Sequence, residues 1–425
     1  MVKGLRRVSP GLRYAGMKLP RCFGSVAASS LVLLVFVARL GAAPAPAEQP
    51  LAELAREQFT FAAQQYAGLL KQMAGNATQQ PRTLVDGKLK AVGPRDWTSG
   101  FFPGSLWLIY EQTKDPAYLA AAKDFTARLE SIQHFTGHHD VGFMLGCSYG
   151  EGWRLTQDPA YKAVLIQGAR SLSTRYSPTV GLIRSWDGNR WQYPVIIDNM
   201  MNLGLLWFAH VETHEPAFRD IVTSHADKTL AHHFRPDGSS FHLVDYNSAT
   251  GAVIKRQTVQ GFADTSAWSR GQAWALAGYA TVARLAKNSA YLAQAKKIAD
   301  FIRHHPRLPA DGIPYWDFDA DNLPNAPRDA AAGAVIAMGL WDLAHQLGAT
   351  EGAPYRALAE KQIRSLASPA YRAAAGENGH FLLKHSVGHF SADTEIDVPL
   401  NYTDYYFLKT LSFILGDAPS PHGVP

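Results

Sequence analysis

The chain has 425 residues, of which 47% are hydrophobic and 18% are charged, so it can form a large buried core and is not a disordered protein. Its formal net charge of +5 comes from residues 1–43, which hold seven basic side chains and no acidic one. Because the rest of the chain is slightly acidic, its composition argues against a nucleic-acid groove or a membrane-surface patch on the folded part.

Residues 1–43 have the pattern of a secretory signal peptide. A basic start is followed by an apolar run at residues 31–37 and by small residues at 41–43. A membrane anchor is the alternative, but Arg39 ends an apolar run that is already shorter than the ~20 residues of a membrane span. We expect export to a bacterial periplasm or to the exterior, with residues 44–52 as a short linker.

The cysteine content fits this expectation. Removal of the leader would take Cys22 away and leave Cys147 as the single cysteine, so the mature chain could form no internal disulfide. Cys147 follows an apolar run at residues 143–145, and we interpret it as a small core residue rather than a nucleophile.

A recurring phrase marks an internal repeat. Residues 113–118, 156–161 and 213–218 each read Thr, a variable residue, Asp or Glu, Pro, Ala and an aromatic residue, and weaker forms occur at 288–291 and 353–355. An acidic residue followed by Pro is typical of a helix start, so each phrase separates an apolar helix from an amphipathic one. The repeat predicts helical hairpins whose apolar helix is buried.

The predicted hairpins are expected to close into a ring. The spacing of the phrases is too uneven for an open solenoid of standard units and favours a closed ring with long loops on one rim. We predict an all-α (α/α)6 barrel of six hairpins over residues 53–418, a flexible tail at 419–425, and only small β-hairpins in loops such as residues 241–244. Six helix starts are expected, at Trp97, Asp140, Asp198, Trp268, Arg328-Asp329 and Asp404.

These helix starts carry residue types that bind and transform acidic sugars. Aromatic faces stack on sugar rings, Arg binds a carboxylate with two parallel hydrogen bonds, and pairs of Asp move protons. Each of Asp140 and Asp198 alone could be a helix cap. Two carboxylates held close together cannot both ionise easily, so the pair predicts one protonated acid and one anion.

Histidines near this pair suggest a metal only weakly. His139 precedes Asp140, and His134 and His138 lie just upstream, but their spacing matches no known set of metal ligands. We expect no metal and no other cofactor, and we interpret His139 as a hydrogen-bonding wall of the pocket.

Several segments resemble the unsaturated glucuronyl hydrolases of glycoside hydrolase family 88. The most specific is residues 260–274, and residues 97–107, 139–143 and 198–202 support it. The resemblance implies an enzyme that removes the terminal 4,5-unsaturated uronate from lyase-generated oligosaccharides by hydrating the C4=C5 double bond. Asp198 would protonate C4 and help water to add at C5, while Asp140 would stabilise the charge that develops on the ring.

The resemblance also implies the residues that line the sugar pocket, with Arg270 as the partner of the substrate carboxylate. They are Trp97, Phe101, His139, His242, Thr258, Gln260, Arg270 and Trp274. Where relatives often carry Gly and His, this chain has Arg256 and Val259, so contacts to the next sugar can differ. The loop at residues 384–391 is a further candidate for substrate selection.

Three other functions remain open at this stage. An unsaturated rhamnogalacturonyl hydrolase would use the same barrel and chemistry on pectin fragments. A sugar 2-epimerase would use His139 and His242 as opposed bases, which leaves the Asp pair without a role. An inert sugar-binding protein would not need the two carboxylates.

Overall fold

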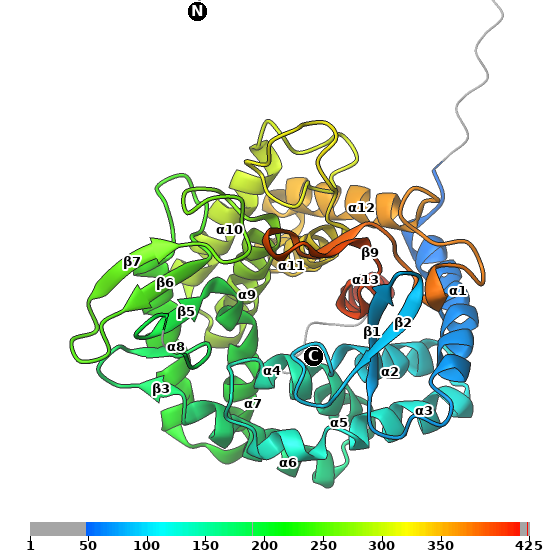
Figure 1. Cartoon of the computed structure of the whole chain (residues 1–425), viewed down its shortest axis with the longest axis horizontal. Helices are drawn as coiled ribbons and strands as arrows, with labels where there is room; N and C mark the ends of the chain where they lie inside the picture. The colour runs from blue at the N-terminus through cyan, green and yellow to red at the C-terminus, as the bar shows by residue number, and fades with distance from the viewer. Residues whose placement is uncertain (1–47, 189, 417–422, 424–425) are drawn as a thin grey trace, which may run out of the picture. The chain divides into compact units, whose positions relative to one another are not determined.

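The computed structural model describes residues 48–188, 190–416 and 423. The chain divides into residues 1–48 and residues 49–425, and the second unit holds the barrel (Figure 1). The predicted signal peptide lies outside the described residues, as does the predicted tail apart from Gly423. None of the described helices is long and apolar enough to cross a membrane.

Six inner helices and six outer helices, counted over the described residues, form the ring and confirm the predicted (α/α)6 barrel. Five pairs are hairpins of consecutive helices. They are α2 (Phe101–Thr113) with α3 (Pro116–Ala127); α4 (Val141–Leu145), the π-helical turn η2 (Gly146–Gly150) and α5 (Glu151–Thr156) with α6 (Pro159–Ser173); the 3₁₀ turn η3 (Ile197–Asn202) and α7 (Leu203–Thr213) with α8 (Pro216–His232); α9 (Ser269–Ala286) with α10 (Ser289–His304); and α11 (Ala330–Glu351) with α12 (Ala353–Ala367).

The sixth pair joins two distant segments. The inner helix α13 (Asn401–Ile414) packs on the outer helix α1 (Leu51–Gln72), and the Tyr66 hydroxyl donates a hydrogen bond to Asp404 Oδ2 at 3.2 Å. A search for local repeats could not find this pair, because its two helices are not consecutive. The helix α1 begins at Leu51, directly after Pro50, so its first two residues fall within the range predicted for the linker.

The turns between paired helices repeat the same local geometry. Asp115 and Asp158 cap α3 and α6, each accepting a hydrogen bond from the backbone N–H two residues later at 2.8 and 2.9 Å. A residue in the left-handed region precedes each cap, with φ of 57° at Lys114 and 55° at Gln157, and His214 has the same conformation, φ 61°, before Glu215, which makes no side-chain cap. This geometry closes the preceding helix and confirms the repeat seen in the sequence.

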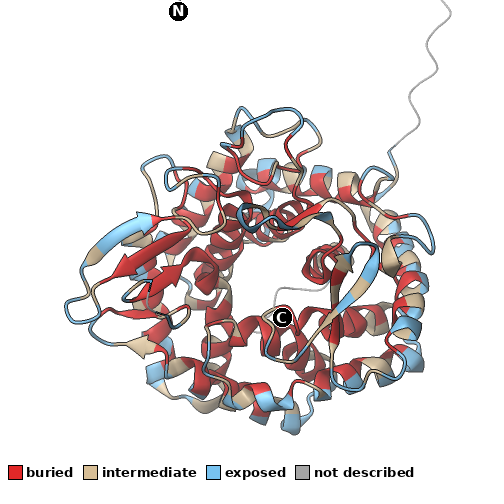
Figure 2. Ribbon diagram, viewed as in Figure 1, coloured by how far each residue is buried: buried red, intermediate tan, exposed pale blue. Residues whose placement is uncertain are grey.

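Burial follows the predicted division between inner and outer helices. Inner helices such as α9 and α13 are buried on nearly every side, whereas the outer helices expose a face to solvent (Figure 2). The core fills the space between the two rings and also the interior of the inner ring, where Trp274 contacts Phe143 and Tyr406. Large buried side chains such as Trp107, Trp274 and Tyr279 belong to it.

The strands lie in loops between helices, and one group is larger than predicted. Residues 241–244 were expected in a small hairpin, but β6 is the middle strand of the antiparallel sheet β5–β6–β7. The loop before η3 and α7 supplies β5, and the loop after α8 supplies β6 and β7, so a local sequence pattern does not reveal the sheet. The strands are β1 (Gln80–Val85), β2 (Lys88–Val92), β3 (Tyr176–Ser177), β4 (Leu182–Ile183), β5 (Pro194–Ile196), β6 (Leu243–Tyr246), β7 (Val253–Gln257), β8 (Ser386–His389) and β9 (Thr394–Val398).

Candidate active site

A pocket lies where several inner helices begin, and it contains both predicted catalytic carboxylates. Most of the predicted substrate-binding side chains also reach it. Its lining is Trp97, His139, Asp140, Phe143, Trp186, Ile196, Asp198, His242, Val259, Gln260, Arg270 and His389.

The sheet β5–β6–β7 brings Asp198 and His242 together. Ile196 at the end of β5 pairs with Leu243 at the start of β6, and the Ile197 N–H donates to the His242 carbonyl at 2.9 Å. This pairing brings the side chains of His242 and Asp198 close together, with His242 Nε2 3.7 Å from Asp198 Oδ2. Strand pairing therefore sets the position of a predicted catalytic residue on the helical barrel.

Asp198 has the properties of an acid that holds a proton near neutral pH. Burial raises its pKa to about 7, the negative charge of Asp140 adds to the rise, and Arg270 opposes it. Its Oδ2 is buried and has no hydrogen-bond partner among the described residues. A protonated carboxyl with an unoccupied oxygen on a pocket wall can donate to a bound substrate.

Asp140 has the opposite preference. Burial alone would raise its pKa, but His139 and His138 outweigh that effect and hold the pKa below its usual range. The contacts are short, with His139 Nε2 3.3 Å from Oδ1 and His138 Nδ1 3.2 Å from Oδ2. The pKa values of the two pocket carboxyls are thus shifted in opposite directions, and the pairing of one acid with one anion stays a prediction.

The hydrogen bonds of His242 define its tautomer. Its Nδ1 accepts from the backbone N–H groups of Val259 and Gln260 at 3.1 and 3.2 Å, so this nitrogen carries no proton. Burial lowers the pKa of His242 well below its usual value, which keeps the ring neutral with its proton on Nε2. That N–H points toward Asp198, and Nε2 has no other partner within the described part of the chain.

Arg270 is held by the protein more completely than expected. Its Nη1 donates to the Val387 carbonyl and lies 3.5 Å from Asp329 Oδ2, and its Nη2 donates to the Gly388 carbonyl at 2.5 Å. Only Nε lacks a partner in the described residues. Arg270 fixes β8 at the pocket, and its contact with a substrate carboxylate stays a prediction.

Three predicted pocket residues lie behind the wall instead of on it. Phe101 and Trp274 are fully buried, because they point from the inner helices into the aromatic core behind Trp97 and Phe143. Thr258 uses its hydroxyl to accept from the Gly261 N–H at 2.7 Å, which holds the loop that carries Gln260. These residues support the pocket but do not line it.

Sequence reasoning missed Trp186, Ile196 and Phe143 as lining residues. Trp186 lies in the loop after β4 and forms a β-bridge with His138, a contact between distant segments that no motif announces. Phe143 was visible, since it lies one helical turn after Asp140 and would share its face. Among the described residues no cluster of His, Cys, Asp or Glu could hold a metal ion.

The chain is similar to known proteins over most of its length. The chain matches the model of glycosyl hydrolase family 88 over residues 69–413. It is 43% identical over 344 residues to an unsaturated glucuronyl hydrolase of Formosa agariphila, covering 80% of this chain and 85% of that protein. It is 30% identical over 333 residues to an unsaturated chondroitin disaccharide hydrolase of Streptococcus pyogenes, covering 77% and 83%.

A solved structure shares the fold. The crystal structure of an unsaturated glucuronyl hydrolase specific for heparin superposes with a TM-score of 0.82 and 44% identity, covering 85% of this chain and 96% of that chain. The family match runs from α1 to α13 and so spans the barrel. It confirms the resemblance seen in the sequence: the chain belongs to glycosyl hydrolase family 88.

Proposed function

We propose that this family 88 enzyme removes the terminal 4,5-unsaturated uronate from lyase-generated oligosaccharides by hydrating its C4=C5 double bond. The observation that carries the proposal is the pair Asp140 and Asp198 on one pocket, with pKa values shifted in opposite directions. An acid and an anion held side by side are what protonation of a vinyl ether requires.

The proposed reaction uses one molecule of water. Protonated Asp198 gives its proton to C4, and positive charge develops at C5 and the ring oxygen, where ionised Asp140 stabilises it. The Asp198 carboxylate then accepts a proton from the water that adds to C5. The resulting hemiketal opens, and the remaining sugar leaves as an alcohol.

Relatives suggest which unsaturated substrate to test first. The solved structure with 44% identity is that of an enzyme specific for heparin, whereas the Streptococcus pyogenes relative with 30% identity is named for chondroitin disaccharides. We therefore propose heparin-derived unsaturated disaccharides as the preferred glycosaminoglycan substrate.

Loss of the ultraviolet absorbance of the conjugated enoate tests both proposals. The purified protein is incubated with unsaturated disaccharides from heparin, chondroitin and pectin, and in D2O the product should carry deuterium at C4. We expect the heparin-derived substrate to give the highest kcat/KM. No loss of absorbance with any substrate would refute the hydration activity, and a preference for the pectin fragment would favour the rhamnogalacturonyl alternative.

Export of the enzyme is a separate proposal, supported by the basic and apolar pattern of residues 1–43. Fractionation of cells that produce the full chain, followed by sequencing of the mature N-terminus, tests it. We expect a shortened chain in the periplasm or the medium. A full-length chain in the cytoplasm would contradict it.

A further inference from the structure

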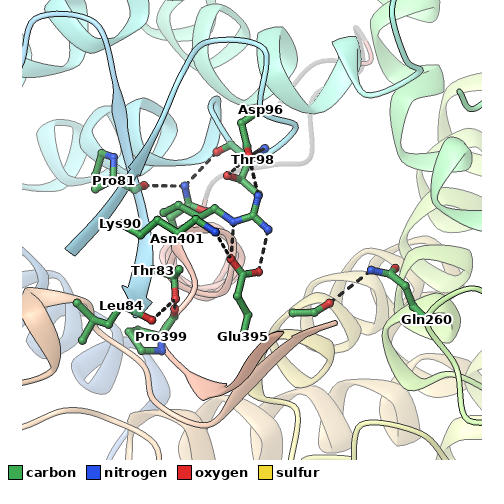
Figure 3. A network of polar contacts seen from close by, with 12 residues as sticks. Pro81, Thr83, Leu84, Lys90, Asp96, Thr98, Gln260, Glu395, Pro399 and Asn401 are labelled. Atoms are coloured by element: carbon green, nitrogen blue, oxygen red, sulfur yellow. Dashed lines mark hydrogen bonds and ion pairs between the residues drawn. The ribbon is translucent and has the colours of Figure 1, made fainter. Parts of the chain in front are cut away.

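A cluster of ion pairs at the edge of the pocket has no part in the proposed chemistry. Arg82 of β1 forms ion pairs with Asp96, which precedes α2, and with Glu395 of β9. Figure 3 labels the two carboxylates and shows the contacts around them. We propose that Arg82 is a positioning residue that joins the Trp97 wall of the pocket to the β8–β9 hairpin and so sets the affinity for substrate. The predicted effect on substrate affinity rests on the proposed function, whereas the predicted effect on the β8–β9 hairpin does not.

One guanidinium serves both carboxylates with paired hydrogen bonds. Its Nη1 contacts Asp96 Oδ1 and Oδ2 at 3.0 and 2.8 Å, while Nε and Nη2 contact Glu395 Oε1 and Oε2 at 2.7 and 2.8 Å. The side chains of Arg82 and Glu395 are only 15% and 7% exposed. Such planar, paired contacts fix orientation as well as charge, which a lysine cannot reproduce.

On one side the cluster orients the Trp97 wall. Asp96 Oδ1 also accepts from the Thr98 N–H at 2.9 Å and the Thr98 hydroxyl at 2.7 Å, which shapes the turn that contains Trp97. The Trp97 ring then packs on Tyr402, with ring centroids 5.0 Å apart, and forms part of the pocket.

On the other side the cluster holds the β8–β9 hairpin. The Glu395 carboxylate lies directly on the backbone of Gly388, where a Cβ atom would come within 2.3 Å of Oε2. The Gly388 carbonyl accepts from Gln260 and Arg270, and His389 follows on the pocket lining. Glu395 itself has a φ of 55°, a conformation that a residue with a side chain adopts reluctantly, so its ion pair keeps it there.

A nearby cation could not replace Arg82. Lys90 Nζ lies 3.7 Å from Glu395 Oε1, but its side chain is 46% exposed, and among the described residues it forms no ion pair with Asp96. Only Arg82 reaches both carboxylates among the described cations. Since Arg82 does not line the pocket, its loss should loosen binding without touching the reacting groups.

Kinetics of Arg82→Gln, Glu395→Gln and the double variant test the proposal. We expect KM for the unsaturated disaccharide to rise on the order of tenfold with kcat within about twofold, because a pocket wall shifts while the acid stays in place. The double variant should be no worse than Arg82→Gln, since both changes break one interaction. Arg82→Lys should fall between wild type and Arg82→Gln.

Arg170→Gln is the matched control. Arg170 of the outer helix α6 forms a similar paired contact with Glu215, which directly precedes the outer helix α8, but both side chains are over 40% exposed. This variant should keep wild-type KM and kcat. If Arg82→Gln does not fold, Glu395→Gln breaks the same contact and leaves Arg82 its pair with Asp96.

Hydrogen–deuterium exchange gives a readout that needs no turnover. We expect the amides of residues 386–398 to exchange faster in Arg82→Gln, while those of β5 and β6 keep the wild-type rate. Unchanged exchange in this hairpin would overturn the proposal even if no substrate is found. The kinetic test is separate from the proposed function. If the wild type is active and both folded variants, Arg82→Gln and Glu395→Gln, keep the wild-type KM or lose only kcat, the role of Arg82 is overturned. The proposed function would still stand.

Discussion

Asp198 and Asp404 lie at corresponding starts of two inner helices, and both are buried, yet their surroundings differ. Burial raises the pKa of each carboxyl to about 7. Asp404 accepts hydrogen bonds from the Leu382 and Leu383 N–H groups at 2.9 and 3.1 Å and from Tyr66 at 3.2 Å. Asp198 lines a pocket with an unpartnered oxygen in the described structure.

The comparison shows that a raised pKa does not by itself identify a catalytic acid. Burial produces the shift in both residues, whatever the carboxyl does. The Asp404 carboxyl forms its hydrogen bonds within the protein, and these bonds connect α13 to α1 and to the loop before β8. Asp198 has an oxygen without a hydrogen-bond partner in the described residues, so under the proposed function substitution of the two should separate catalysis from stability.

The largest effect is expected from Asp198→Asn. Asn cannot donate a proton to C4, so kcat should fall by about 10³-fold or more, the upper range for loss of a general acid. The enoate absorbance assay measures the loss, and circular dichroism should show an unchanged fold. A folded variant with substantial turnover would remove Asp198 from the proposed mechanism.

Asp140→Asn should have a smaller effect with a signature in the pH profile. The wild-type kcat/KM should decline above about pH 7, because Asp198 must be protonated and loses its proton there. The charge of Asp140 raises that pKa, so its removal should move the decline to lower pH, and kcat should fall about 10- to 100-fold as charge stabilisation is lost.

The pH profiles of wild type and Asp140→Asn, recorded under the same ionic strength, decide this prediction. A decline at the same pH in both proteins would mean that the charge of Asp140 does not act on the titrating acid. If kcat/KM rises with pH through 7, the titrating group acts as a base, and the pH dependence does not report a protonated Asp198.

Asp404→Asn should change stability rather than activity. Asp404 accepts hydrogen bonds from two backbone N–H groups, and Asn would place its NH2 group against one of these donors. We therefore expect a loss of about 1–3 kcal/mol in the free energy of unfolding. The kcat per folded molecule should not change. Urea unfolding and kinetics at saturating substrate measure the two quantities. A fall in kcat like that of Asp198→Asn would erase the difference between the two residues.

The same variant has a predicted pH dependence. Between the unfolded pKa near 4 and the folded pKa of about 7, the folded state holds a proton on Asp404 that the unfolded chain has released. The contribution of this group to stability therefore falls as pH rises through that window. Asp404→Asn should show a shallower decline than wild type, while Asp198 keeps its own contribution in both.

The barrel was predictable because its signals are local. The caps at Asp115 and Asp158 and the apolar inner helices can be read within a few residues. The pair of α1 with α13 could not be found this way, since it joins helices more than 300 residues apart. The sheet that places His242 beside Asp198 escaped for the same reason.

Positions in the site were predictable where a polar side chain at a helix start had a clear chemical role. Asp140, Asp198 and His139 reach the pocket as expected. Phe101 and Trp274 fit the sugar-stacking interpretation by type, but the direction of a side chain from an inner helix depends on how its neighbours pack. Asp329 stands at another of the predicted helix starts, where it caps α11, contacts Arg270 and accepts a hydrogen bond from the Val387 N–H of β8.

Cys147→Ala should have the smallest effect. Cys147 lies in the π-helical turn of the same inner helix that begins at Asp140, and burial raises the pKa of its thiol, so it is not a nucleophile at neutral pH. It lines a second cavity, which shares the Phe143 side chain with the active-site pocket. We expect a loss of about 1 kcal/mol in stability from the smaller side chain, with kcat and KM unchanged. Alkylation should modify Cys147 in urea but not in the native enzyme, and a change in KM would show that Phe143 transmits packing changes from the second cavity to the substrate.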